Sequence, residues 1–176
     1  MKRTVLTFGI ISGLMFVVMM FATIPFVDRI GFGKAQIIGY TTMVLSFLMV
    51  FFGIRSYRDN VGGGQISFGR AFAVGSLIML IGCAFYVVTW EIIYFKFIPD
   101  FPDKYANYLV EKAQASGSTP AEIAAIREQV KSMKAILDNP FLSGAIAFIE
   151  PLPVGLVMTL ISAAILRRKH ASEAVS

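Results

Sequence analysis

The chain has 176 residues, of which 56% are hydrophobic and only 15% are charged, and its formal net charge is +5 at pH 7. Soluble domains carry about 25% charged residues, so this composition excludes an ordinary soluble protein and predicts that much of the surface faces lipid. The one cysteine, Cys83, excludes a disulfide framework, and the one histidine, His170, excludes most zinc sites and His-based catalytic triads.

Four segments are long enough to cross a bilayer, which needs about 20 mostly apolar residues. They cover residues 4–27, 35–54, 71–95 and 141–166. Backbone groups in hydrocarbon must be satisfied within the segment, so each is predicted to be a helix. The first run is too long for the apolar region of a signal peptide and no cleavage motif follows it, so we interpret it as a retained span. The predicted fold is all-α, with one membrane domain over residues 1–176.

The first span contains the spacing Gly9-x-x-x-Gly13. Two small residues four positions apart allow a second helix to approach closely in a membrane. The motif is frequent in membrane helices, so it is compatible with packing inside one bundle and with dimerisation.

Lysine and arginine bias predicts the orientation. The N-terminal residues, the loop after the second span and the segment after the fourth are rich in these residues, with only Asp59 and Glu173 opposing them: Lys2, Arg3, Arg55, Arg58, Arg70, Arg167, Arg168 and Lys169. We therefore expect both termini in the cytoplasm. The three arginines of the loop, Arg55, Arg58 and Arg70, are expected to contact anionic lipid, at about 1 kcal/mol each. The positive charge thus has a topological cause and does not imply nucleic acid.

The same loop contains three consecutive glycines, Gly62, Gly63 and Gly64. From Gly64 the sequence is G-x-x-x-x-G-R, close to a phosphate-binding P-loop. That loop requires lysine and Ser/Thr where this chain has Arg70 and Ala71, and it requires a preceding strand, so we reject nucleotide binding. We interpret the glycines as permitting a tight re-entry into the bilayer, with Ser67 capping the third span.

Glu91 and Glu150 are the acidic residues of the spans, where ionisable groups are costly and often functional. Counting about 20 residues per crossing places Glu91 at the outer boundary, next to an expected aromatic belt of Trp90 and Tyr94. The same count places Glu150 about 5 Å inside the hydrocarbon. Its cationic partner is expected to be one of three residues on the same side: Arg29, Lys34 or Lys96.

Pro151 and Pro153 follow Glu150 directly. Proline removes backbone donors and disfavours helix in the preceding residue, so the fourth span either kinks or starts at Glu150. A carboxylate that caps a helix N-terminus and a proton or cation site remain alternatives for Glu150.

Residues 99–139 differ in kind from the spans. Thr119-Pro120-Ala121-Glu122 is a capping box with proline at the first helical position, and it predicts a helix start. Apolar residues then recur at helical spacing: Ile123, Ile126, Val130, Met133 and Leu137. A weaker helical pattern covers residues 103–115. We expect a helical hairpin outside the cytoplasm, with its apolar stripe on the partner helix, on the membrane surface or on another protein.

The spans, the glycine loop and the Glu-Pro motif together resemble the domain-of-unknown-function 4199 family of small four-span bacterial membrane proteins. The resemblance covers nearly the whole chain and rests on an ordered set: Gly9 and Gly13, FFGIRSYRD at 51–59, GQISFG at 64–69, Ala71-Phe72, Trp90-Glu91, EPLPVGL at 150–156, LISAAIL at 160–166 and RRK at 167–169. It implies a fold and an address in the bacterial inner membrane. It implies no activity, substrate or cofactor.

No catalytic or metal-ligand constellation is recognisable, so we expect neither an enzyme nor a cofactor. The first functional hypothesis is a non-enzymatic protein that binds a partner through the helix at 119–137 or scaffolds a complex. The alternative is a small oligomeric transporter or channel that uses Glu150. An intramembrane enzyme acting on lipid ranks last.

Overall fold

The structure is a computed structural model that describes residues 1–168, so Lys169, His170 and Glu173 lie outside it. The described residues are almost entirely helical and contain no strand. The helices are α1 (Lys2–Thr23), η1 (Ile24–Phe26), α2 (Val27–Ile30), α3 (Phe32–Asn60), α4 (Phe68–Phe97), α5 (Phe101–Ala115), α6 (Pro120–Leu137), α7 (Pro140–Ile149) and α8 (Leu152–Leu166).

Four helical segments are long and apolar enough to cross a membrane: Lys2–Ile30, Phe32–Asn60, Phe68–Phe97 and Pro140–Leu166. The predicted number of spans is therefore confirmed. Each helical segment is longer than the apolar run that predicted it. α3, for example, continues through Arg55 and Arg58, because a long basic side chain at a helix end can reach water without ending the helix.

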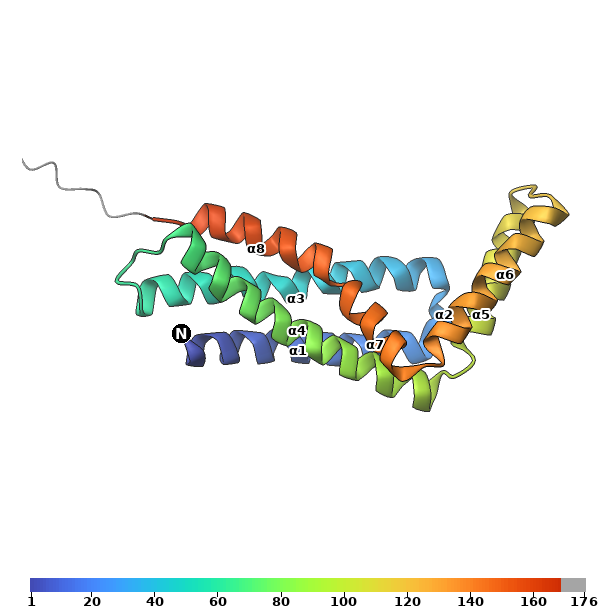
Figure 1. The fold of residues 1–176 in the computed structure, drawn as a ribbon, viewed down its shortest axis with the longest axis horizontal. Helices are drawn as coiled ribbons and strands as arrows, with labels where there is room; N and C mark the ends of the chain where they lie inside the picture. Colours follow the sequence, from blue (N-terminus) through green and yellow to red (C-terminus); the bar gives the residue numbers. More distant parts are fainter. Residues whose placement is uncertain (169–176) are drawn as a thin grey trace, which may run out of the picture.

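The long helices form an elongated bundle (Figure 1). α4 packs against α1, α3, α7 and α8. Phe16 of α1 makes edge-to-face contacts with Phe47 of α3 and Tyr86 of α4, each at a ring-centroid distance of 5.3 Å. Phe16 and Phe47 are fully buried, so they form the centre of the core. The outward side chains are largely apolar, as a lipid-facing surface requires: Leu6, Leu14, Val18, Ile37, Val88, Val157 and Ile165 among others.

Gly9 and Gly13 lie at the contact between α1 and α4. A methyl group on Gly9 would lie 2.8 Å from Ile81 Cβ, and one on Gly13 would overlap the Phe85 ring. Both glycines are buried. The small-residue spacing therefore serves packing inside the bundle, one of the two roles that the sequence left open.

The fourth span is broken. α7 ends at Ile149 and α8 begins at Leu152, and the two short helices lie at an angle to each other (Figure 1). Pro151 and Pro153 supply no backbone N–H, which interrupts the helical hydrogen-bond ladder at this point. Pro151 is fully buried, whereas Pro153 is exposed on the first turn of α8. The span thus consists of two helices joined at Glu150 and Pro151.

α5 and α6 lie side by side at the opposite end of the bundle from Lys2 and the loop between α3 and α4 (Figure 1). The predicted capping box is present: Thr119 Oγ1 accepts from the Glu122 N–H at 3.3 Å, and the Thr119 N–H donates to Glu122 Oε2 at 2.7 Å. Val130 and Leu137 of the apolar stripe are buried, as is Val110 of α5. Two of the five stripe residues are therefore buried within the chain, and the other three are half-buried. We call these two helices the α5–α6 pair.

Candidate functional site

The contact between α4 and α7 is rich in polar side chains. Tyr86, Trp90 and Tyr94 follow one another at four-residue spacing, which places them on one face of α4. Each donates a hydrogen bond to α7 or to a residue beside it. Tyr86 Oη donates to Glu150 Oε2, just after α7, at 2.7 Å; Trp90 Nε1 donates to Ser143 Oγ, within α7, at 3.2 Å; and Tyr94 Oη donates to Asp138 Oδ1, just before α7, at 2.8 Å. We call these three pairs the polar seam.

The polar seam changes the interpretation of the aromatic residues. Tyr94 is only 1% exposed, and Trp90 stacks on it with ring centroids 5.8 Å apart. The polar atoms of Trp90 and Tyr94 are therefore used inside the chain, and the aromatic belt expected at the outer boundary stays a prediction. Aromatic residues with a polar end usually find a hydrogen-bond partner when buried.

Glu150 lies at the break between α7 and α8. Its carboxylate accepts the hydrogen bond of Tyr86, and no side chain caps the start of α8. Within residues 1–168 no ion pair joins Glu150 to Arg29, Lys34 or Lys96, so its hydrogen-bond partner is a neutral phenol and none of the expected cations. Glu150 is otherwise exposed on the side of the bundle.

Glu91 is half-buried and faces the same contact. Its Oε1 atom is buried and has no hydrogen-bond partner among the described residues. A methyl group on Gly144 of α7 would lie 3.9 Å from this atom, so the carboxylate points toward α7. A buried carboxylate oxygen without a partner is costly. It has the capacity to accept a proton or a cation.

The three arginines expected in the loop between α3 and α4 lie in the two flanking helices, and two of them share one acidic partner. Arg58 Nε lies 2.7 Å from Asp59 Oδ1, and Arg55 Nε lies 3.7 Å from Asp59 Oδ2. Arg58 is the more buried of the two, with 12% of its side chain exposed against 59% for Arg55. Arg70 is exposed at the start of α4 and forms no ion pair with residues 1–168. The arginines therefore do not converge on one anion site.

The glycines of this loop make a tight turn possible. Gly63 and Gly64 have φ angles of +60° and +82°, and a side chain on Gly62 would overlap the Gln65 carbonyl. Ser67 Oγ accepts from the Arg70 N–H at 3.3 Å, which confirms the predicted cap of the third span. Ile66 and Arg168 exchange two backbone hydrogen bonds, at 3.1 and 2.9 Å, and so join the loop to the end of α8.

Tyr86, Ser143 and Asp138 of the polar seam were not among the candidate residues. The four-residue spacing of Tyr86, Trp90 and Tyr94 was the available signal, because it places three hydrogen-bond donors on one helical face. The identity of their acceptors required the fold, since the three acceptors lie 44 to 64 positions further along the chain.

Comparisons with known proteins identify a family and no activity. A search of the curated proteins and one of the solved structures gave no match. The family model described as "Protein of unknown function (DUF4199)" matches residues 7–168, which is most of the chain and includes the polar seam. The resemblance expected from the ordered motifs is confirmed, and the chain belongs to the DUF4199 family.

Proposed function

We propose that this protein is a non-enzymatic, multi-pass membrane protein that binds a protein partner through the exposed face of the α5–α6 pair. The carrying observation is that both helices of the pair have apolar residues already buried within this chain, Val110 in α5 and Val130 and Leu137 in α6. The pair is therefore folded before any partner arrives. A pre-ordered surface loses less conformational entropy on binding than a flexible one.

The exposed face of α6 differs from the stripe in composition. It consists mostly of small and polar residues at helical spacing: Ala121, Ala125, Glu128, Ser132 and Ala135. Small side chains allow a partner helix to approach the α6 backbone closely. The proposed contact is thus on this face, opposite the apolar stripe that the sequence pattern singled out.

The orientation is part of the same proposal. The N-terminus, the loop between α3 and α4 and the end of α8 lie at one end of the bundle and the α5–α6 pair at the other (Figure 1). We infer from the positive-inside bias that the first end is cytoplasmic in a bacterial inner membrane. A cysteine at Ala115 should then react with a membrane-impermeant maleimide added outside, and a cysteine at Ser67 should not.

The partner proposal is tested by co-purification of the full chain from native membranes in mild detergent, with the mass and stoichiometry of each complex determined. Ala125→Arg and Ala135→Arg place bulky charges on the exposed face of α6. We expect both to remove a stoichiometric partner that wild type retains. Ala115→Arg, an exposed alanine of α5, is the matched control and should retain it. A partner that survives both α6 substitutions would overturn the proposal.

A small oligomeric transporter is the second candidate, supported by the unpartnered Glu91 Oε1 near the broken fourth span. A proton or cation path would use Glu91 or Glu150. In proteoliposomes under a pH gradient, Glu91→Gln and Glu150→Gln should then each abolish flux. Glu128→Gln, on the exposed face of α6, is the control. Equal flux in wild type and all variants rejects a path through these two carboxylates, and no flux in wild type rejects transport.

A further inference from the structure

A groove of about 380 Å³ lies between α1 and the C-terminal half of α3. This volume falls within the range of small-molecule sites. The groove is at the opposite end of the bundle from the α5–α6 pair (Figure 1), so it is independent of the partner proposal. One lining residue comes from α1 and the others from one face of α3: Phe8, Met49, Phe52, Arg55, Ser56 and Asp59.

The two ends of the groove differ in chemistry. The lining residues nearer the middle of α3 are apolar, and those near its C-terminal end are charged or polar. From Met49 to Asp59 the helical rise gives about 15 Å, which is half the thickness of the hydrocarbon core. In a spanning helix the groove therefore reaches from the level of the headgroups along one leaflet.

Gly53 determines the shape of the apolar end. A methyl group on Gly53 would lie 3.2 Å from Phe8 Cβ, so Phe8 of α1 sits directly against the backbone of α3. Phe52, the preceding residue of α3, is 44% exposed. Its exposed ring and the half-buried Phe8 and Met49 offer an apolar wall on the outside of the bundle.

The charged end has one positive charge in excess. Asp59 Oδ1 accepts a hydrogen bond from Arg58 Nε at 2.7 Å, and the Arg58 side chain is only 12% exposed. Arg55 Nε is 3.7 Å from Asp59 Oδ2, beyond hydrogen-bond distance, and its side chain is 59% exposed. Two arginines and one aspartate leave one positive charge, which Arg55 presents to the groove. Charge complementarity therefore favours an anion with one negative charge.

Ser56 supplies a second donor beside Arg55. Its Oγ accepts from Asn60 Nδ2 at 3.2 Å, and its own O–H donates to no acceptor within residues 1–168. A guanidinium matches two phosphate oxygens with two parallel N–H groups. Arg55 and Ser56 together thus offer a phosphodiester donors for several of its oxygens.

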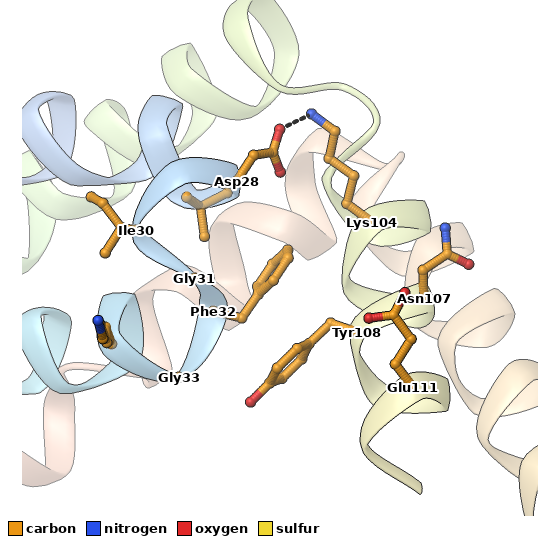
Figure 2. Close-up of a pocket in the computed structure, with 11 residues that line it drawn as sticks. Asp28, Ile30, Gly31, Phe32, Gly33, Lys104, Asn107, Tyr108 and Glu111 are labelled. Atoms are coloured by element: carbon orange, nitrogen blue, oxygen red, sulfur yellow. Dashed lines mark hydrogen bonds and ion pairs between the residues drawn. The ribbon is translucent and has the colours of Figure 1, made fainter. Parts of the chain in front are cut away.

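The groove differs in this respect from the pocket at the other end of α3. That pocket has a volume of about 470 Å³ and lies between the start of α3 and α5 (Figure 2). Its Lys104 donates to Asp28 at 2.6 Å, and its charged lining residues are two acids and two lysines. No charge is in excess there, so that pocket does not select an anion.

We propose that the groove binds one anionic phospholipid. Its phosphodiester contacts Arg55 and Ser56, and one acyl chain lies along Phe8, Met49 and Phe52. An ammonium headgroup is disfavoured, because it would bring a further positive charge to a site that already has one in excess. Phosphatidylglycerol has the required chemistry, since its headgroup carries the phosphodiester charge and no cation.

The test uses the full-length protein reconstituted in nanodiscs that contain equal amounts of phosphatidylglycerol and phosphatidylcholine with the same acyl chains. Lipids that remain on the protein after extraction are counted by native mass spectrometry. We expect phosphatidylglycerol to be retained preferentially. Nanodiscs present both leaflets, so the result does not depend on the orientation of the chain. Equal retention of the two lipids would overturn the proposal.

Arg55→Gln should lower the retention of phosphatidylglycerol about ten-fold, the loss that accompanies removal of one charge-assisted hydrogen bond. Arg70→Gln removes the same charge from another exposed arginine, which starts α4 and does not line the groove, and it should retain the lipid. Equal losses in the two variants would show that the lipid is held by the overall positive charge, and they would overturn the site.

The apolar end is tested with a second matched pair. Phe52 and Leu45 are exposed to similar extents on α3, at 44% and 46%, and only Phe52 lines the groove. Phe52→Ala should lower retention, and Leu45→Ala should not. Retention unchanged by Phe52→Ala would overturn the acyl-chain contact. Loss of the partner in the α6 variants leaves these results unaffected, so the two proposals fail separately.

Discussion

The four-span bundle and the α5–α6 pair are held together by different kinds of contact. In the part of the chain that the structure describes, both ion pairs that join two helices involve α5: Lys104 with Asp28, and Lys134 with Asp103, each at 2.6 Å. The spanning helices are joined instead by glycine contacts and by the hydrogen bonds of the polar seam.

This difference follows from the two solvents. In lipid, apolar side chains gain nothing by leaving the hydrocarbon, so small residues and interhelical hydrogen bonds supply the association. In water, burial of the apolar stripe of α6 is favourable and charged side chains remain solvated. Substitutions at the glycine contacts of the bundle should therefore have large effects that salt and pH do not change. Substitutions of charged residues in the pair should have small effects that salt or pH does change.

The largest effect is expected for Gly13→Ala. The added methyl group would overlap the Phe85 ring, and overpacking of this kind costs about 1–3 kcal/mol. Gly39→Ala is the matched control in α3, because nothing lies within 4 Å of the added group. It should be neutral or stabilise the helix by up to about 1 kcal/mol. Unfolding of the purified protein in mixed micelles measures both changes.

Equal stabilities of the two alanine variants would contradict the glycine contact between α1 and α4. A Gly13→Ala variant that is stable as a monomer but no longer self-associates would instead assign the glycine spacing to dimerisation.

A smaller effect is expected for Tyr86→Phe, which removes the hydrogen bond to Glu150. Hydrogen bonds between membrane helices contribute about 0.6 kcal/mol on average and up to about 1.7. The coupling is measured in the same unfolding assay by a double-mutant cycle with Glu150→Ala, which removes the acceptor. Tyr105→Phe, in α5, is the control and should change nothing, since Tyr105 makes no side-chain hydrogen bond within residues 1–168. A coupling energy of zero would show that the hydrogen bond between Tyr86 and Glu150 does not stabilise the bundle.

The predictable part of the fold is the part set by local sequence. Long apolar runs predict spans because the thickness of the bilayer fixes their length. Ser67 and the capping box at Thr119 predict helix starts because each satisfies orphan N–H groups within four residues. These predictions need no knowledge of any other helix.

The unpredicted part is the choice of neighbours. A spanning helix is apolar on all sides, so its sequence does not indicate which face meets the bundle. Gly13 could not be assigned to Phe85, nor Glu150 to Tyr86, although each residue was a candidate from the sequence. The α6 stripe was ambiguous for the same reason, because an apolar face predicts burial and leaves the covering element open.

Within the α5–α6 pair, Lys134→Gln should have a small effect that depends on salt. The Asp103 carboxylate raises the pKa of Lys134, which keeps the ammonium charged at neutral pH. Exposed ion pairs are screened as ionic strength increases. Amide hydrogen exchange in α6 should therefore be faster than wild type at low salt and equal to wild type near 1 M. A difference that persists at high salt would indicate lost packing instead.

The smallest effect is expected for Glu122→Gln, because glutamine can still complete a capping box. The N–H and hydroxyl of Thr119 lower the pKa of Glu122 below its ordinary value of 4.5. A carboxyl whose pKa is depressed in the folded state stabilises that state above the unfolded pKa and loses this contribution as the pH falls through the folded pKa.

Hydrogen exchange of the first-turn amides of α6 measures this effect, with both proteins compared at equal pH so that intrinsic rates cancel. Exchange should be slower in wild type than in the variant above pH 4.5. The difference should shrink below that pH, because protonated glutamic acid and glutamine then carry the same charge. A difference that stays constant through this range would show that the α6 cap depends on the shape of the Glu122 side chain, and the contrast between glycine contacts that do not respond to pH and a pair that does would then fail at this residue.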